Sequence, residues 1–150
     1  MQKMPCAPIR STTLLVLLLT GCGAGSGEGL DANGQPIGDG GGTPLAPTLA
    51  SIQANVFTPS CAVAGCHSGA TAQQGLRLDP GFSADGLIGV ASPRDSRLVR
   101  VVPADPNNSF LIQKLEGTQR LGDRMPLGGP FLPQSDINVI RQWIANGALR

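Results

Sequence analysis

Apolar residues recur at helical spacing only after the first third of the chain. Leu49, Ile52 and Val56 stand at positions i, i+3 and i+7, so they share one face of a helix. This spacing predicts a short amphipathic helix over residues 48–57. Pro59 follows soon after, and we expect the helix to end there because proline cannot donate the backbone hydrogen bond that a continuing helix needs.

The clearest pattern lies near the C-terminus. Ile137, Ile140 and Ile144 repeat with the same spacing. Trp143 stands beside them, and together these residues predict a final helix with one buried face. Gly147 comes next, at the place where glycine commonly adopts the left-handed conformation just past the end of a helix.

The segments in between predict shorter elements. Residues 83–90 are long enough for one or two helical turns, and an Asp-Pro pair begins a helix over 106–116 that Gly117 ends. Residues 76–78 and 98–102 have the apolar character of extended pieces. There is no internal repeat. The predicted fold class is therefore all-α, with long loops between short helices.

The N-terminus has the features of an export signal. Lys3 and Arg10 provide positive charge, and residues 14–19 form an apolar run that is too short to span a bilayer. The run Leu-Thr-Gly-Cys that ends at Cys22 resembles the lipobox of bacterial lipoprotein signals, in which the peptide is cut before the cysteine and the cysteine is acylated. The resemblance implies a signal peptide over 1–21 and a lipid anchor on Cys22.

A Gly-rich stretch over residues 22–46 has no apolar period and predicts a flexible tether. The remaining residues, 47–150, are enough for one small globular domain. The cysteine inside the signal peptide would be removed with it, and Cys22 would carry lipid. The resemblance thus implies an exported, membrane-anchored protein that faces the periplasm or the cell surface, in which Cys61 and Cys66 would be the free cysteine pair.

Composition excludes several classes of function. Residues 47–150 carry nine Lys and Arg against seven Asp and Glu, a balance that does not suggest a nucleic-acid binder. The chain has no nucleophile elbow, phosphate loop or metalloprotease motif. It holds one tryptophan, four phenylalanines and no tyrosine, and a core this poor in aromatic rings would gain from a bound group that fills it.

The most informative stretch is Cys61-Ala-Val-Ala-Gly-Cys66-His67. Haem c is held by thioether bonds from two cysteines to the porphyrin vinyl groups, and a histidine directly after the second cysteine ligates the iron. The usual spacer has two residues and this one has four, similar to the gap in some multihaem cytochromes. Three of the four are Ala or Gly, which can bulge outward while both sulfurs reach the ring. We therefore expect one covalent haem c on Cys61 and Cys66, with His67 as an axial ligand.

Other assignments of these residues stay open. Cysteine pairs in exported proteins commonly oxidise, so Cys61 and Cys66 could form a disulfide with His67 uninvolved. A zinc ion would need four close ligands, and the sequence has no second Cys or His cluster. The three residues could also occur together by chance in a domain without haem.

A haem iron that transfers electrons without binding small molecules needs a second axial ligand. His67 is the only histidine, and Met1 and Met4 leave with the signal peptide, so Met125 is the only thioether of the mature chain. The proline after Met125 restricts the backbone there, which favours a fixed ligand over a methionine that fills a gap in the core. Lys114 is a conceivable substitute, but its ammonium group must first lose a proton.

The order of these pieces is similar to that of small single-haem cytochrome c domains, especially the planctomycete-type group of exported and lipid-anchored bacterial proteins. The similarity covers about residues 48–149. The matching pieces are the stretch Cys61 to His67, the run Val-Pro-Ala-Asp-Pro-Asn-Asn-Ser-Phe-Leu from Val102, Arg124-Met125-Pro126, and the run Ile-Arg-Gln-Trp-Ile-Ala-Asn-Gly-Ala from Ile140. The resemblance implies a cytochrome c-like helical domain around one haem, with Met125 opposite His67. It also implies one-electron transfer with redox partner proteins, and no enzyme activity.

Arg94, Arg97 and Arg100 form a basic run. One of them could pair with a haem propionate, because guanidinium groups suit carboxylates. The others could face solvent or steer an acidic redox partner. Two rival functions stay open: a haem sensor or small-molecule haem protein with an open sixth position, and a haem-free interaction module closed by a disulfide.

Overall fold

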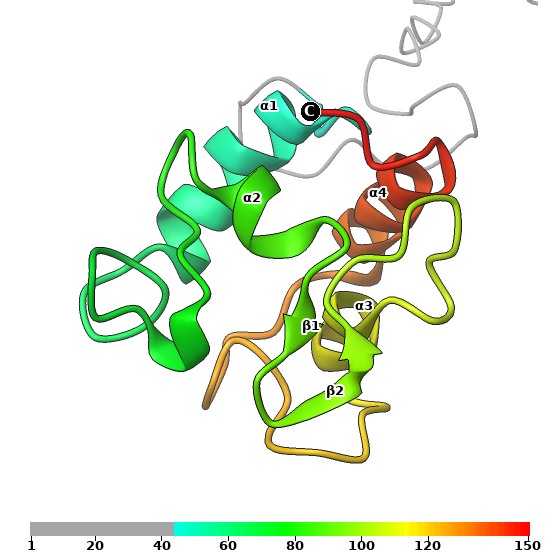
Figure 1. Ribbon diagram of the computed structural model, residues 1–150. Helices are drawn as coiled ribbons and strands as arrows, with labels where there is room; N and C mark the ends of the chain where they lie inside the picture. Colours follow the sequence, from blue (N-terminus) through cyan, green and yellow to red (C-terminus); the bar gives the residue numbers. More distant parts are fainter. Residues whose placement is uncertain (1–43) are drawn as a thin grey trace, which may run out of the picture. The chain divides into compact units, whose positions relative to one another are not determined.

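The structure is a computed structural model that describes residues 44–150. The predicted signal peptide 1–21, the lipidation site Cys22 and residues 22–43 of the predicted tether lie outside the described residues. Figure 1 shows the arrangement of the elements. In chain order these are α1 Leu49–Ile52, the π-helical η1 Gln53–Cys61, the 3-10 turn η2 Gln73–Gly75, α2 Ser83–Leu87, β1 Ala91–Ser92, β2 Asp95–Val99, α3 Phe110–Glu116 and α4 Gln134–Ala145.

The predicted all-α fold class is wrong. Over residues 44–150 the protein is 37% helical and 10% strand, and β1 pairs antiparallel with β2. Ala91 lies opposite Val99, and Ser92 opposite Asp95. The extended character of residues 98–102 was predicted, but its partner strand was not. The two residues of β1 are too few to show the alternating pattern by which a strand is recognised.

The first helix does not end at Pro59. The helical segment continues from α1 through η1 to Cys61, and the Ala62 amide donates to the carbonyl of Phe57, five residues earlier, at 2.7 Å. A proline ring presses on the preceding turn of an ordinary α-helix, whereas the wider π turn leaves room for it. Cys61 is therefore the last residue of this helical segment.

The helix predicted over 106–116 begins later than expected, at Phe110. The Asp105 carboxylate accepts from the Asn108 amide at 3.1 Å, so the Asp-Pro pair starts a turn and not the helix. The C-terminal end agrees with the prediction, because Gly117 has a φ of 79° in the left-handed region.

The last predicted helix is confirmed as α4. Ile137, Ile140 and Ile144 are all buried. Gly147 has a φ of 94°, and its amide donates to the carbonyl of Ile144 at 2.9 Å. The next amide, of Ala148, donates to the carbonyl of Trp143 at 3.0 Å, which completes a Schellman end to the helix.

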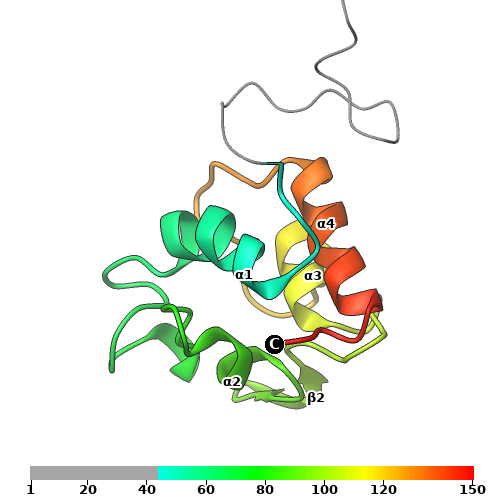
Figure 2. The ribbon, with the colours of Figure 1, turned by 90° about the horizontal axis from the view of Figure 1, so that it is seen from above.

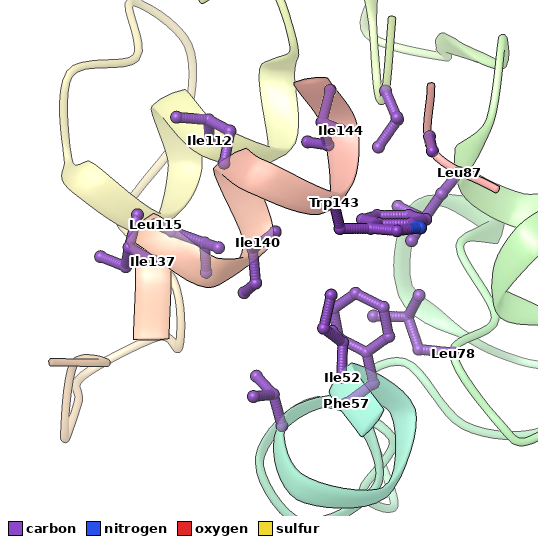
Figure 3. Packing of buried hydrophobic residues seen from close by; sticks show 13 residues of the cluster. Ile52, Phe57, Leu78, Leu87, Ile112, Leu115, Ile137, Ile140, Trp143 and Ile144 are labelled. Atoms are coloured by element: carbon purple, nitrogen blue, oxygen red, sulfur yellow. The ribbon is translucent and has the colours of Figure 1, made fainter. Parts of the chain in front are cut away.

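Helices α3 and α4, the two longest α-helices of the described residues, pack against each other and lie side by side in Figure 2. In Figure 3 Leu115 of α3 lies beside Ile137 of α4, and Ile112 and Ile140 belong to the same cluster. All four side chains are buried, so they form one side of the hydrophobic core.

The other side of the core joins α4 to the first helical segment. Trp143 is 1% exposed, and in Figure 3 its ring reaches from α4 toward Leu87, while Phe57 and Leu78 face it from the opposite direction. The indole Nε1 donates to the carbonyl of Leu149 at 2.9 Å, so the one polar atom of this side chain is satisfied. The core therefore reaches Phe57 on η1 and Leu78, the two buried residues that bracket the Cys61–His67 stretch.

Replacing Trp143 by alanine should remove the central side chain of this core. We expect the free energy of unfolding to fall by about 3–5 kcal/mol, the range for truncation of a buried aromatic residue. Urea unfolding followed by circular dichroism measures this, since the variant lacks the chain's only tryptophan. Gln142→Ala, on the exposed face of the same helix, should change stability by less than about 0.5 kcal/mol. Equal effects of the two substitutions would contradict the packing described here.

Candidate functional site

The structure brings Cys61, Cys66 and His67 together on one tight turn. Cys61 ends η1. The Cys66 amide donates to the carbonyl of Val63 at 3.0 Å, and the His67 amide donates back to the carbonyl of Cys61 at 3.1 Å. Gly65, with a φ of 80°, supplies the left-handed residue that this turn requires. The four-residue spacer is thus folded back on itself, and both thiols are free, with Cys61 half-buried and Cys66 exposed.

The imidazole of His67 is held by the chain that returns from this turn. Its Nδ1 lies 3.1 Å from the carbonyl oxygen of Leu76. A carbonyl can only accept, so Nδ1 carries the proton and Nε2 keeps its lone pair. The His67 carbonyl in turn accepts from the Leu78 amide at 2.7 Å. This is the arrangement that orients a metal-binding histidine: one ring nitrogen is fixed by the protein and the other is left to bind.

The electrostatic surroundings keep the Cys61 thiol and the His67 imidazole uncharged at neutral pH. Burial lowers the pKa of His67 from its ordinary value, and the nearby positive charge of Arg100 lowers it further, although hydrogen bonds to the backbone partly oppose this. Burial raises the pKa of the Cys61 thiol to about 11, and the neighbouring Cys66 also raises it. Cys61 is therefore a neutral thiol and His67 a neutral imidazole, the form that binds metals.

The Asp79 carboxylate, which no sequence pattern identified, is hydrogen-bonded to the two residues that follow His67. Asp79 accepts from the Ser68 hydroxyl at 2.7 Å, from the Gly69 amide at 2.8 Å and from the Arg77 guanidinium. These partners lower the pKa of Asp79 to about 2, with the Arg77 hydrogen bond as the largest cause. Arg77 stands two residues before Asp79, but Ser68 and Gly69 stand eleven and ten residues away, so no local sequence signal identifies these two contacts.

Met125 lies on a different loop, which is fastened to α3. Its amide donates to the carbonyl of Lys114 at 2.9 Å. The Lys114 ammonium donates to the carbonyls of Leu121 at 2.7 Å and Asp123 at 3.0 Å, and Arg124 donates to the carbonyl of Leu115 at 2.8 Å. Met125 is thus half-buried on a loop with a fixed backbone. Lys114, the conceivable substitute ligand, already uses its ammonium group to hold that loop.

The three arginines of the basic run have different surroundings. Arg97 is exposed and makes a two-pronged ion pair with Asp95, with distances of 3.0 and 2.8 Å. Arg94 is also exposed. Arg100, by contrast, is buried, with 8% of its surface exposed. Two of the three therefore fit the expectation of a solvated face, and Arg100 does not.

In the part of the chain that the structure describes, no three Cys, His, Asp or Glu side chains gather into a group that could hold a metal ion. No helix among residues 44–150 has the length and apolar character needed to cross a membrane. Comparison with protein-family models, with curated proteins and with solved structures gives no match.

The depressed pKa of Asp79 makes the loop sensitive to acid. Its ordinary pKa is 3.8 and its folded pKa is about 2. The charged form is favoured in the folded state, so the stabilisation is complete above about pH 4 and is lost as the pH falls toward 2. Asp79→Asn should therefore be less stable than the wild type at pH 6, with a difference that shrinks across this window. Urea unfolding of both proteins between pH 2 and pH 6 measures it, and a difference that does not vary with pH would contradict the assignment.

Proposed function

We propose that residues 47–150 form a monohaem c-type cytochrome domain that transfers one electron at a time. The observation that carries the proposal is the hydrogen bond from His67 Nδ1 to the carbonyl of Leu76, on a turn that also bears both free cysteines. It leaves Nε2 unprotonated in the residue that directly follows the second cysteine. Haem c, when bound, supplies a one-electron ferric–ferrous couple.

The donor set fits this group. Cys61 and Cys66 would hold it through two thioether bonds, and His67 would provide the first axial nitrogen. The exposure of Cys66 supports attachment at the protein surface, where a redox partner has access. The fold of the spacer supports it as well, because the turn keeps the His67 amide within 3.1 Å of the Cys61 carbonyl despite the longer gap.

Met125 would provide the second axial ligand. Three side-chain hydrogen bonds and one backbone hydrogen bond hold its loop on α3, so its backbone does not need to be ordered when it binds. Lys114 is occupied by two carbonyls and its ammonium would need to release a proton, so the thioether is the better ligand. If His67 and Met125 both held the group, no position would be left for a small molecule, which would favour electron transfer.

The proposal extends to the location of the protein. The signal-like N-terminus and Cys22 support an exported lipoprotein, held on a membrane by acyl chains and tethered through residues 22–46. Such a tether would let the domain reach membrane-bound or soluble redox proteins near its anchor. Redox partner proteins are thus the proposed partners.

Covalent haem is the first consequence to test. The mature protein, produced in a host that attaches haem c, should retain one haem after denaturation and extraction with acidic organic solvent. Cys61→Ala or Cys66→Ala should weaken attachment, and the double variant should abolish it. The matched control is Cys22→Ser, which should lose membrane association and keep its haem. A colourless wild type with an intact Cys61–Cys66 disulfide would overturn the proposal in favour of the interaction module.

The second consequence concerns Met125. The ferric protein should show the weak long-wavelength absorption band of a sulfur–iron bond, and Met125→Ala should remove it. The same variant should have a lower reduction potential, because a thioether stabilises ferrous iron more than ferric iron. It should also bind carbon monoxide or cyanide. A wild type that already binds these ligands, with no change in Met125→Ala, would instead support the haem sensor or small-molecule haem protein.

A further inference from the structure

Arg100 is a buried cation whose partners are neutral. Its Nη1 donates to the carbonyl of Gly86 at 2.7 Å and its Nη2 to the carbonyl of Gln74 at 2.6 Å. None of the ion pairs found among residues 44–150 involves it. A buried guanidinium is normally paired with a carboxylate, because its desolvation is costly.

The two accepting carbonyls explain why the charge is tolerated. Gly86 lies in the last turn of α2 and Gln74 in the 3-10 turn η2. Both carbonyl oxygens are the negative ends of peptide dipoles, and that of Gly86 also stands at the C-terminal end of a helix, where partial negative charge stabilises cations. The guanidinium group keeps its proton in proteins, so Arg100 places a permanent positive charge inside the domain.

A short path of bonds leads from Arg100 to His67. Gln74 stands two residues before Leu76, whose carbonyl faces His67 Nδ1. The backbone of Arg100 is itself fixed, because its amide donates to the carbonyl of Val90 at 2.8 Å and its carbonyl accepts from the Leu111 amide at 2.9 Å. Arg100 thus connects the loop that returns to His67 with α2 and α3.

We propose that Arg100 is a positioning residue of the haem site: it holds the segment 74–76 against His67 and, as a fixed buried cation, raises the reduction potential of the iron. The second half rests on the proposed function. Ferric iron carries one positive charge more than ferrous iron, so a nearby cation disfavours the oxidised state. The effect is larger inside a protein than in water, because the dielectric constant is lower.

The test separates the charge from the hydrogen bonds. Arg100→Gln removes the charge. Arg100→Lys keeps the charge, but its ammonium group lacks the planar guanidinium that donates to both carbonyls. Arg97→Gln is the matched control, because Arg97 belongs to the same run and its side chain is 88% exposed. The reduction potential of each haem-loaded protein is measured by spectroelectrochemical titration.

We expect the reduction potential of Arg100→Gln to be lower than that of the wild type by about 59 mV. For a one-electron couple, this shift corresponds to a ferrous-to-ferric ratio about tenfold lower at a given electrode potential. Arg100→Lys should stay close to the wild type in potential, as should Arg97→Gln. An unchanged potential in Arg100→Gln, or an equal shift in Arg97→Gln, would overturn the electrostatic role. So would a potential in Arg100→Lys as low as that of Arg100→Gln.

Hydrogen–deuterium exchange tests the positioning role without using the iron. The amides of Gln73 and Leu78 donate to the carbonyls of Cys66 and His67, both at 2.7 Å, and report on the returning segment. Both Arg100 variants should exchange these amides faster, while Arg97→Gln should not. Unchanged exchange in the two Arg100 variants would overturn the positioning role. A wild type without covalent haem would refute the proposed function and the electrostatic role, whereas this comparison would still decide whether Arg100 holds the segment.

Discussion

The hydrogen bond between His67 Nδ1 and the carbonyl of Leu76 is the constraint on which the rest of the site depends. Because the two bonded residues are nine apart in the chain, the chain must turn after Cys66 and return to the His67 side chain at Leu76. The outgoing turn carries the two thiols, and the returning segment carries the carbonyl that selects the tautomer of the imidazole. Few apolar side chains of this loop are buried, so polar contacts and not burial determine its shape.

The hydrophobic core supports this loop at both of its ends. Phe57 on η1 and Leu78 on the returning segment are buried in the core, and Gln53 adds a side-chain bond to the carbonyl of Leu78 at 2.9 Å. The loop therefore projects from two points that are fixed relative to each other by packing. Asp79 and Arg100 add polar contacts to it: the partly buried Asp79 carboxylate accepts from the Gly69 amide, and the buried Arg100 guanidinium donates to the carbonyl of Gln74.

The sequence predicted those features that depend on residues close together in the chain. The periodicity of α4 and the left-handed glycines after α3 and α4 are local signals, and the structure agrees with them. The path of the chain past Pro59 depends on a wider helical turn, and the all-α expectation failed because β1 is only two residues long. The selection of Arg100 from a run of three similar arginines depends on η2 and α2, which are distant in sequence, so spacing alone could not identify it.

The long spacer between the cysteines bears directly on whether His67 can act as a ligand. An extended insertion of two residues would move the second cysteine and the histidine away from the first. Here the Cys66 amide closes a turn on Val63, and the His67 amide reaches the carbonyl of Cys61. The added residues are taken up within that turn, and Ala64 and Gly65 are exposed, so they displace no part of the core. The spacing of the cysteines and the position of the histidine are therefore separate properties of this loop. The position of His67 depends on the returning segment, which Arg100 and Asp79 contact through hydrogen bonds.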